Sequence, residues 1–169
     1  MIVLETERLT LRLATLVDAE FVLRLLNEPS FLKYIGDRGV RTADDARRYI
    51  AVRLIDSYER HGFGLWIVER KESPGPIGIS GLVKRDALPD PDIGFAFLPE
   101  FWSAGYAYES ALAVKQHALG VLRLPRLLAV TNPDNAGSIR IVEKLGLTRD
   151  RMIALSADAP EVCLFALEA

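Results

Sequence analysis

Cysteine and histidine are scarce in this sequence of 169 residues, which holds one cysteine, Cys163, and two histidines, His61 and His117. A lone thiol cannot build an internal disulfide framework or a cysteine-based zinc site. Two histidines far apart in the chain argue against a His-rich metal site. We therefore expect no metal ion, and we interpret Cys163 as a small buried apolar residue near the C-terminus.

The sequence also lacks a long apolar run and an excess of basic residues. No stretch approaches the ~20 apolar residues that a membrane-spanning helix needs, and Glu5 and Glu7 stand where a signal peptide requires its apolar core. The net charge is −2, with basic residues scattered among acidic ones, so there is no basic footprint for nucleic acid. These absences predict a cytoplasmic protein without a membrane or nucleic-acid partner.

Apolar residues, by contrast, make up 50% of the chain, which suffices for one domain with its own core over residues 1–169. Leucines that alternate with polar residues predict a half-buried strand over 6–13. Thr15 with Asp18, and Thr42 with Asp45, have the spacing of a capping box. They predict two helices that run to about residues 27 and 60.

The second half of the sequence predicts more strands than helices. β-rich runs separated by Pro/Gly turns at 73–76 and 88–91 predict an antiparallel meander. The predicted elements are, in order, strands at 63–69, 76–83 and 92–98, a helix at 104–119, a strand at 126–131, a helix at 135–145, and strands at 147–155 and 162–167. This order indicates an α/β protein with a mixed sheet and helices on both faces.

The most informative segment, residues 93–107, is a strand that runs into a turn of small residues and then into a helix. The start of a helix offers free backbone N–H groups and the positive end of the helix dipole, and both favour a phosphate. Small residues such as Gly105 let that phosphate approach the backbone. Tight packing of a helix on the sheet would explain the same small residues. This segment alone therefore does not distinguish a phosphate-binding loop from helix packing.

Three motifs resemble the GNAT acetyltransferases, in the same order along the chain. Trp102-x-x-Gly105-x-Ala107 resembles the pyrophosphate loop of the family, Gln/Arg-x-x-Gly-x-Gly/Ala. The longer string 93–109 looks like the Rim-type branch, named for enzymes that acetylate ribosomal-protein N-termini. The string 132–147 is similar to the Asn-x-x-Ser helix of that branch with its Glu-Lys-Leu-Gly-Phe ending, and the opening 7–12, Glu-Arg-Leu-x-Leu-Arg, also matches.

The resemblance covers the whole chain and implies a GNAT fold, a mixed, mostly antiparallel central sheet with helices on both faces. It implies an N-acetyltransferase that moves the acetyl group of acetyl-CoA to a primary amine, which attacks the thioester directly. The residues that it implies for the cofactor are Phe95, Phe97, Leu98, Trp102, Ser103, Ala104, Gly105, Tyr106, Ala107, Asn135 and Ser138.

Within that set, the family assigns the oxyanion to backbone N–H groups of the strand, here residues 95–98. Asn135 matches a residue that bonds to the pantetheine arm, although asparagine also suits a helix N-cap. Gly94 and Ala96 share one face of the strand. Their small side chains would leave room for the arm, or would pack beneath a helix.

The sequence departs from the family pattern at the loop and in the last helix. Ser103-Ala104 stand where the family often has Gly-Lys or Gly-Arg, so a cation that could meet a phosphate is absent there. Val142 stands where many members carry a tyrosine as general acid for the thiolate. Ser138, one helical turn earlier, is the substitute candidate.

Asp92 is the candidate general base, because several family members carry a working glutamate at this strand start. In a partly apolar cleft its pKa would be raised, which suits a base. The plain alternative is a solvated turn residue after Pro91.

The acceptor amine is the least determined part of the reaction. An aromatic pocket from Phe31, Tyr34 and Trp66 is one option, but core packing explains Phe31 and Trp66 equally well. The acceptor is then a peptide or protein N-terminus or a small-molecule amine, and Asp86, Asp90 and Asp92 could give a small cationic one an acidic cleft. A catalytically inactive CoA-binding sensor is the alternative function, and the apolar C-terminal strand could pair across a homodimer.

Overall fold

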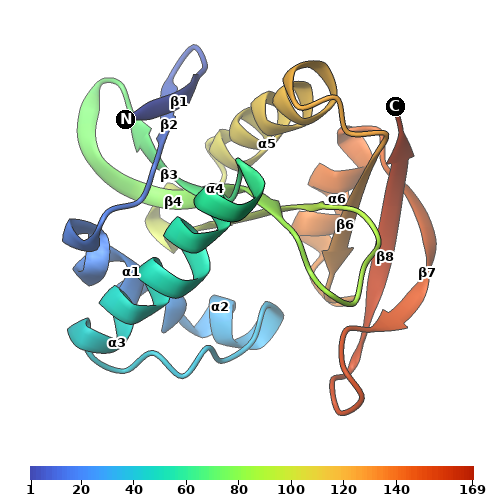
Figure 1. Ribbon diagram of the computed structural model, residues 1–169, viewed down its shortest axis with the longest axis horizontal. Coiled ribbons are helices and arrows are strands. Elements are labelled where there is room, and N and C mark those ends of the chain that lie inside the picture. The colour runs from blue at the N-terminus through green and yellow to red at the C-terminus, as the bar shows by residue number, and fades with distance from the viewer.

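A single twisted sheet of eight strands organises the molecule (Figure 1). The computed structural model describes all residues, 1–169. The strands lie in the order β1-β2-β3-β4-β5-β6-β8-β7, and β5 and β6 are the one parallel pair of neighbours. Their bounds are β1 (Ile2–Glu5), β2 (Leu9–Arg12), β3 (Leu65–Arg70), β4 (Ser73–Val83), β5 (Asp92–Phe97), β6 (Arg126–Thr131), β7 (Thr148–Ala154) and β8 (Glu161–Glu168). The predicted mixed, mostly antiparallel sheet is confirmed.

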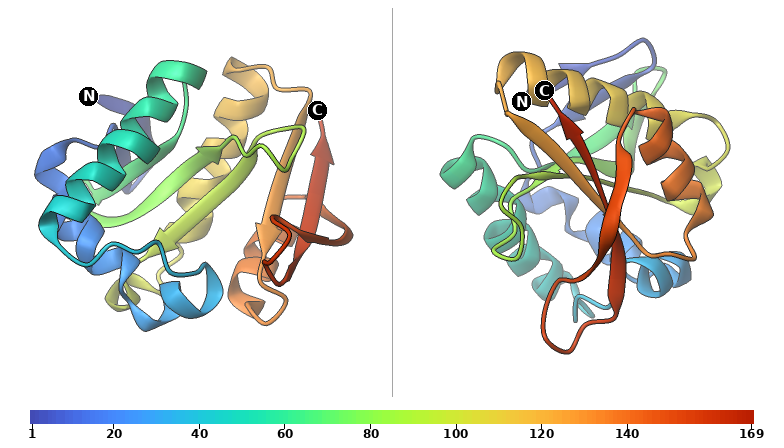
Figure 2. Two further views of the ribbon diagram at one scale, coloured as in Figure 1. Left: turned by 60° about the horizontal axis from the view of Figure 1, so that its bottom comes forward. Right: turned by 90° about the vertical axis from the view of Figure 1, so that its right-hand side faces the viewer.

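Helices cover both faces of this sheet, as predicted (Figure 2). The helices are α1 (Ala19–Leu26), α2 (Pro29–Tyr34), α3 (Ala43–Tyr49), α4 (Asp56–His61), α5 (Tyr106–Gln116) and α6 (Ala136–Lys144). The first three and the helical turns after α3 pack around a core that includes Val22, Ile50 and Leu98. Helices α5 and α6 pack on the other face around Val114 and Val142. No helix combines the length and apolarity that crossing a membrane requires.

The local signals for helix ends are confirmed. Both capping boxes are present, Thr15 with Asp18 and Thr42 with Asp45. From Thr42 the chain stays helical through α3, a π-helical stretch at Ile50–Ile55 and α4, which ends at His61 beside the predicted residue 60. These ends form because short polar side chains satisfy amides that the first helical turn leaves free.

Three boundaries differ from the prediction. The expected strand over 6–13 is a hairpin, in which β1 precedes a turn at 6–8 and β2 spans only Leu9–Arg12. Pro29 ends the first helix but also begins α2, because its fixed φ and missing N–H suit the first turn of a helix. The turn expected at 73–76 lies at Lys71 and Glu72 instead, and 73–76 belongs to β4, whose pairing with β3 is irregular there.

The C-terminal strand cannot pair across a dimer in the way the sequence suggested. Strand β8 lies between β6 and β7 and has a partner along both edges. The free edge at this end of the sheet belongs to β7, whose residues are almost all exposed.

Candidate active site

Strands β5 and β6 diverge and leave a V-shaped opening in the sheet. They are paired at one position, Asp92 with Leu128, where the Leu128 N–H also donates to the Pro91 carbonyl at 3.0 Å. The main chain of β5 alternates, and the Leu98 N–H donates toward β4, to the Ile77 carbonyl at 3.0 Å. The N–H groups of Phe95 and Phe97 therefore point the other way, into the V, where β6 is out of reach.

Because of this alternation, one predicted cofactor residue, Leu98, cannot offer its amide to a ligand in the V. The Leu98 amide is already used by Ile77, and its side chain is buried in the core beside α1–α3. The two amides that can receive a ligand in the V are those of Phe95 and Phe97. Gly94 and Ala96, the small residues of the other face, are both half-buried: Gly94 lies against Leu65 and Val83, and Ala96 packs in that same core.

The loop between β5 and α5 presents a row of unused amides. The N–H groups of residues 103–108 make no hydrogen bond within the chain. Gly105, the N-cap of α5, has φ 84°, and Ser103 has φ 63°. A serine in this left-handed region is strained by about 1–2 kcal/mol, so the loop keeps a conformation suited to glycine although the glycine is missing at 103.

Trp102, at the start of the loop, is held by a hydrogen bond from its ring nitrogen and is not buried. Its indole N–H donates to the Phe97 carbonyl at 2.8 Å, and the residue is 51% exposed. This bond fixes the exit of the chain from β5. Residues Ser103, Ala104 and Gly105 are exposed beside it, and Tyr106 and Ala107 are half-buried at the first turn of α5.

The C-terminal end of β6 and the start of α6 form the other side of the V. The Asn135 side chain caps α6 and accepts from the Ser138 N–H at 3.3 Å. This is its one hydrogen bond, so its amide N–H₂ group has no acceptor in the chain. Val142 is buried at 1% exposure in the core beneath α5 and α6, where a reacting thiolate cannot reach it.

Thr131, the last residue of β6, is a candidate site residue that the sequence did not indicate. It is 7% exposed, and its hydroxyl oxygen is buried without a hydrogen-bond partner. It lies opposite Cys163 on β8, so it faces α5 and α6 with the alternate residues Leu127 and Ala129. A threonine at a strand end carries no sequence signal of this kind; only the missing partner identifies it.

Asp92 lies at the closed end of the V, buried rather than solvated. Its side chain is 1% exposed, and Arg85 donates to both carboxylate oxygens, at 2.9 Å from Nε and 3.3 Å from Nη2. Burial raises the pKa of Asp92, and the nearby guanidinium of Arg85 opposes that rise. Arg85 was not a predicted site residue, because the loop that returns it to Asp92 has no sequence signature.

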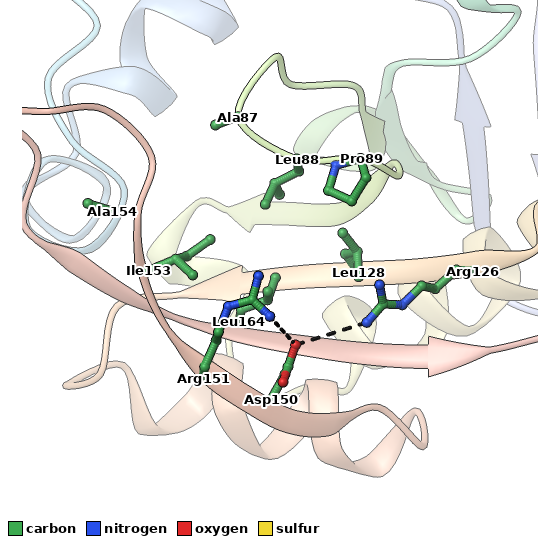
Figure 3. Close-up of a pocket in the computed structure, with 10 residues that line it drawn as sticks. All are labelled: Ala87, Leu88, Pro89, Arg126, Leu128, Asp150, Arg151, Ile153, Ala154 and Leu164. Atoms are coloured by element: carbon green, nitrogen blue, oxygen red, sulfur yellow. Dashed lines mark hydrogen bonds and ion pairs between the residues drawn. The ribbon is translucent and has the colours of Figure 1, made fainter.

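That loop, residues 84–91, covers the sheet on the face opposite α5 and α6. Lys84 donates to the carbonyls of Arg85 and Leu88 at 3.0 and 2.8 Å, and Leu88 is buried against Leu128 and Leu164. Between the loop and β7 lies a cavity of about 160 Å³ (Figure 3). Its floor is apolar, and because Leu128 is the register partner of Asp92, the two side chains lie on the same face of the sheet.

The rim of this cavity carries mixed charge. Asp150 lies between two arginines, 2.9 Å from Arg151 Nη1 and 4.0 Å from Arg126 Nη2 (Figure 3). The acidic cleft expected from Asp86, Asp90 and Asp92 is not formed here, because none of the three lines this cavity and Asp92 is paired with Arg85. Arg126 is also paired with Glu168 at 2.9 Å, so the cavity offers apolar contacts and a rim on which the charges balance.

The expected aromatic pocket is not formed by the three residues named for it. Trp66 is 1% exposed and lies in the core beneath α5, on the face opposite α1–α4. Phe31 is 6% exposed in the core of that other face. Tyr34 alone is partly exposed, with the Lys33 ammonium 4.8 Å from its ring centroid.

Comparison with known proteins agrees with the family resemblance of the sequence motifs. The model of the acetyltransferase (GNAT) domain matches residues 8–148. YoaA of Bacillus subtilis, an uncharacterized N-acetyltransferase, is 30% identical over 154 residues, which cover 89% of this chain and 85% of YoaA.

Two solved structures share the fold over nearly their full lengths. An acetyltransferase from Agrobacterium tumefaciens is 25% identical with a TM-score of 0.83, over 98% of this chain and 94% of that one. The ribosomal-protein-S5-alanine acetyltransferase from Vibrio fischeri is 15% identical with a TM-score of 0.81, over 98% and 95%.

Proposed function

Because this chain belongs to the GNAT acetyltransferase family, we propose that it transfers the acetyl group of acetyl-CoA to a primary amine that attacks the thioester directly. The observation that carries the proposal is the set of unused N–H groups at residues 103–108, next to the opening between β5 and β6. A diphosphate on the loop and a pantetheine arm in the opening would use both features at once. We further propose that the enzyme works in the cytoplasm, where the unpaired thiol of Cys163 stays reduced.

In this proposal the cofactor is held mostly by main-chain groups. Amides of residues 103–107 meet the diphosphate, and the amides of Phe95 and Phe97 face the arm and the thioester carbonyl. A preorganised N–H donor at that carbonyl would stabilise the negative charge that develops in the tetrahedral intermediate. We assign the free amide of Asn135, at the start of α6, and the unpaired buried hydroxyl of Thr131, at the end of β6, to the carbonyls and amides of the arm.

Proton transfer is proposed to run through Asp92 and water. An amine attacks only when neutral, so a proton must leave it before or during attack. A buried carboxylate with a raised pKa can hold that proton, but at 1% exposure it must receive it through a water molecule rather than from the amine itself. Ser138 remains the proposed donor to the thiolate, whose ordinary pKa of about 8.5 makes it a good leaving group.

The acceptor that this arrangement favours is an α-amino group of a peptide or protein. Such a group has a pKa of about 7.7–8.0, so roughly a tenth is neutral at pH 7, against about one in 2,500 for a lysine. The shielded Asp92 can give only indirect help, which favours the more acidic amine. The mixed rim of Arg126, Asp150 and Arg151 also does not suit a polycation.

The test combines calorimetry with an acceptor panel. The purified protein is titrated with CoA, and free thiol release from acetyl-CoA is then followed with peptides of varied N-terminal residue, free amino acids and polyamines. Saturable CoA binding and turnover with peptides is the expected result. CoA binding with no turnover on any amine would favour the inactive sensor, whereas no CoA binding at millimolar concentration would overturn the proposal.

A further inference from the structure

Two arginines from the β1–β3 part of the sheet lie beside the loop that precedes α5. The guanidinium carbon of Arg8, in the turn between β1 and β2, lies 4.5 Å from the ring centroid of Tyr106. A terminal nitrogen of Arg8 lies 3.3 Å from the point that a Cβ on Gly105 would occupy. The guanidinium carbon of Arg70, at the end of β3, lies 4.8 Å from the ring centroid of Phe101.

The protein positions both head groups without using up their donors. Arg8 donates from Nε to Glu109 at 2.8 Å, and its main-chain N–H donates to the same carboxylate at 3.1 Å. Its two terminal nitrogens donate to no group of the chain. Arg70 Nε is buried without a partner, and its nearest acid is Glu72, at 3.7 Å in a pair whose acidic side chain is 76% exposed.

This placement supplies positive charge near the loop, where Ser103-Ala104 provide none. The first turn of α5 carries the acidic Glu109, which would repel an approaching phosphate, and Arg8 cancels that charge while its terminal donors stay free. The side chains of Arg8 and Arg70 are 43% and 25% exposed, so an anion on the loop could reach them. Cation–π contacts with Tyr106 and Phe101 hold the two guanidinium groups beside the loop.

We propose that Arg8 and Arg70 form the cationic part of the CoA site and bind its phosphate groups from the β1–β3 side of the loop. The inference rests on the proposed function, because it concerns the same cofactor. Arginine suits this task since its planar fork can donate two parallel hydrogen bonds to a phosphate. The cations that the loop sequence lacks are thus supplied by residues about 30 and 95 positions earlier in the chain.

The experiment measures CoA affinity by calorimetry in wild type, Arg8→Gln, Arg70→Gln and the double variant. Each single change is expected to raise Kd roughly tenfold to a hundredfold, the loss of one hydrogen bond to a charged group. Arg149→Gln is the matched control. Arg149 lies on β7, at the opposite edge of the sheet, with its guanidinium carbon 5.5 Å from the ring centroid of Phe165 on β8. Its Kd should equal that of the wild type.

Dependence on salt separates phosphate binding from a structural role. Titrations at increasing KCl should weaken CoA binding to the wild type more steeply than to the double variant, because fewer charges remain to be screened. With an acceptor found by the panel, the variants should raise KM for acetyl-CoA and leave kcat unchanged. Arg8→Lys and Arg70→Lys, which keep the charge, should recover part of the affinity.

The outcomes keep the two proposals apart. If the wild type binds no CoA, the proposed function itself fails. If it binds CoA but both glutamine variants keep its Kd and salt slope, only the inference about the arginines is overturned. Should Arg8→Gln melt too early for titration, since it also frees Glu109, Arg70→Gln and the lysine variants decide.

Discussion

Replacing Arg85 with glutamine would leave the buried carboxylate of Asp92 without its partner. Removing one member of a fully buried ion pair typically costs about 3–5 kcal/mol. The side chain of Arg85 is 28% exposed, so water screens part of the interaction, while that of Asp92 is only 1% exposed. We therefore expect Arg85→Gln to lower the free energy of unfolding by about 2–3 kcal/mol at pH 8.

The loss should depend on pH in one direction. Burial raises the pKa of Asp92 and Arg85 opposes that rise, so the variant has a still higher pKa. A carboxyl whose folded-state pKa exceeds its unfolded value favours the folded state at low pH, and this advantage is lost as pH rises through the folded pKa. The difference in the free energy of unfolding between wild type and variant should therefore grow as pH rises above the folded-state pKa of Asp92 in the wild type. The growth is about 1.4 kcal/mol per pH unit at most.

Urea denaturation at pH 5 and pH 8 measures this gap, and activity gives a second readout. If Asp92 accepts the proton, the acidic limb of kcat/KM should move to higher pH in Arg85→Gln. Asp92→Asn serves as the control, because its stability should lose the pH dependence and its turnover should fall while CoA binding is kept. A gap that is equal at pH 5 and pH 8 would refute the buried-pair reasoning, and an unmoved acidic limb would remove Asp92 from the mechanism.

Three further changes test the loop and the opening. Gly105→Ala puts a side chain at φ 84° and should cost about 1 kcal/mol of stability and weaken CoA binding; unchanged melting would contradict the strain. Ser103→Gly should relieve similar strain at φ 63° and raise Tm by about 2–4 °C, measured by thermal melting, with unchanged CoA affinity; a lower Tm would count against it. Thr131→Val removes an unpaired buried hydroxyl and should stabilise the free protein by about 1 kcal/mol in urea while raising Kd for CoA severalfold; an unchanged Kd would remove Thr131 from the site.

Features set by neighbouring residues were predictable from the sequence. The capping boxes at Thr15 and Thr42 and the strand over 126–131 follow from local hydrogen bonds and side-chain alternation, and all are present. The loop at 103–107 is predicted as a cofactor site from its resemblance to the family's pyrophosphate loop, and the local signals of a helix start and small residues agree with that resemblance. The structure adds that the amides there are unused.

Features set by distant contacts were not predictable. Trp66, Ile67 and Val68 are all buried, because β3 is covered on both faces, so the sequence shows no alternation that assigns Trp66 to one side. The turn at 6–8 looked like part of a strand, since nothing nearby in sequence reveals that Glu109 holds it. Arg85 was missed for the same reason, because its partner depends on how the loop 84–91 folds back.

In the proposed site, reliance on main-chain donors would explain how the loop can depart from the family sequence and still bind a diphosphate. An amide at residues 103–107 presents the same N–H whatever its side chain, provided that the backbone keeps its angles. The constrained positions are therefore those that set φ, Gly105 and Ser103, and Ser103 retains the left-handed geometry without being glycine. A charge that the loop has lost can then be restored by any cation that reaches it from elsewhere in the fold, because a phosphate responds to the position of the charge and not to its place in the sequence.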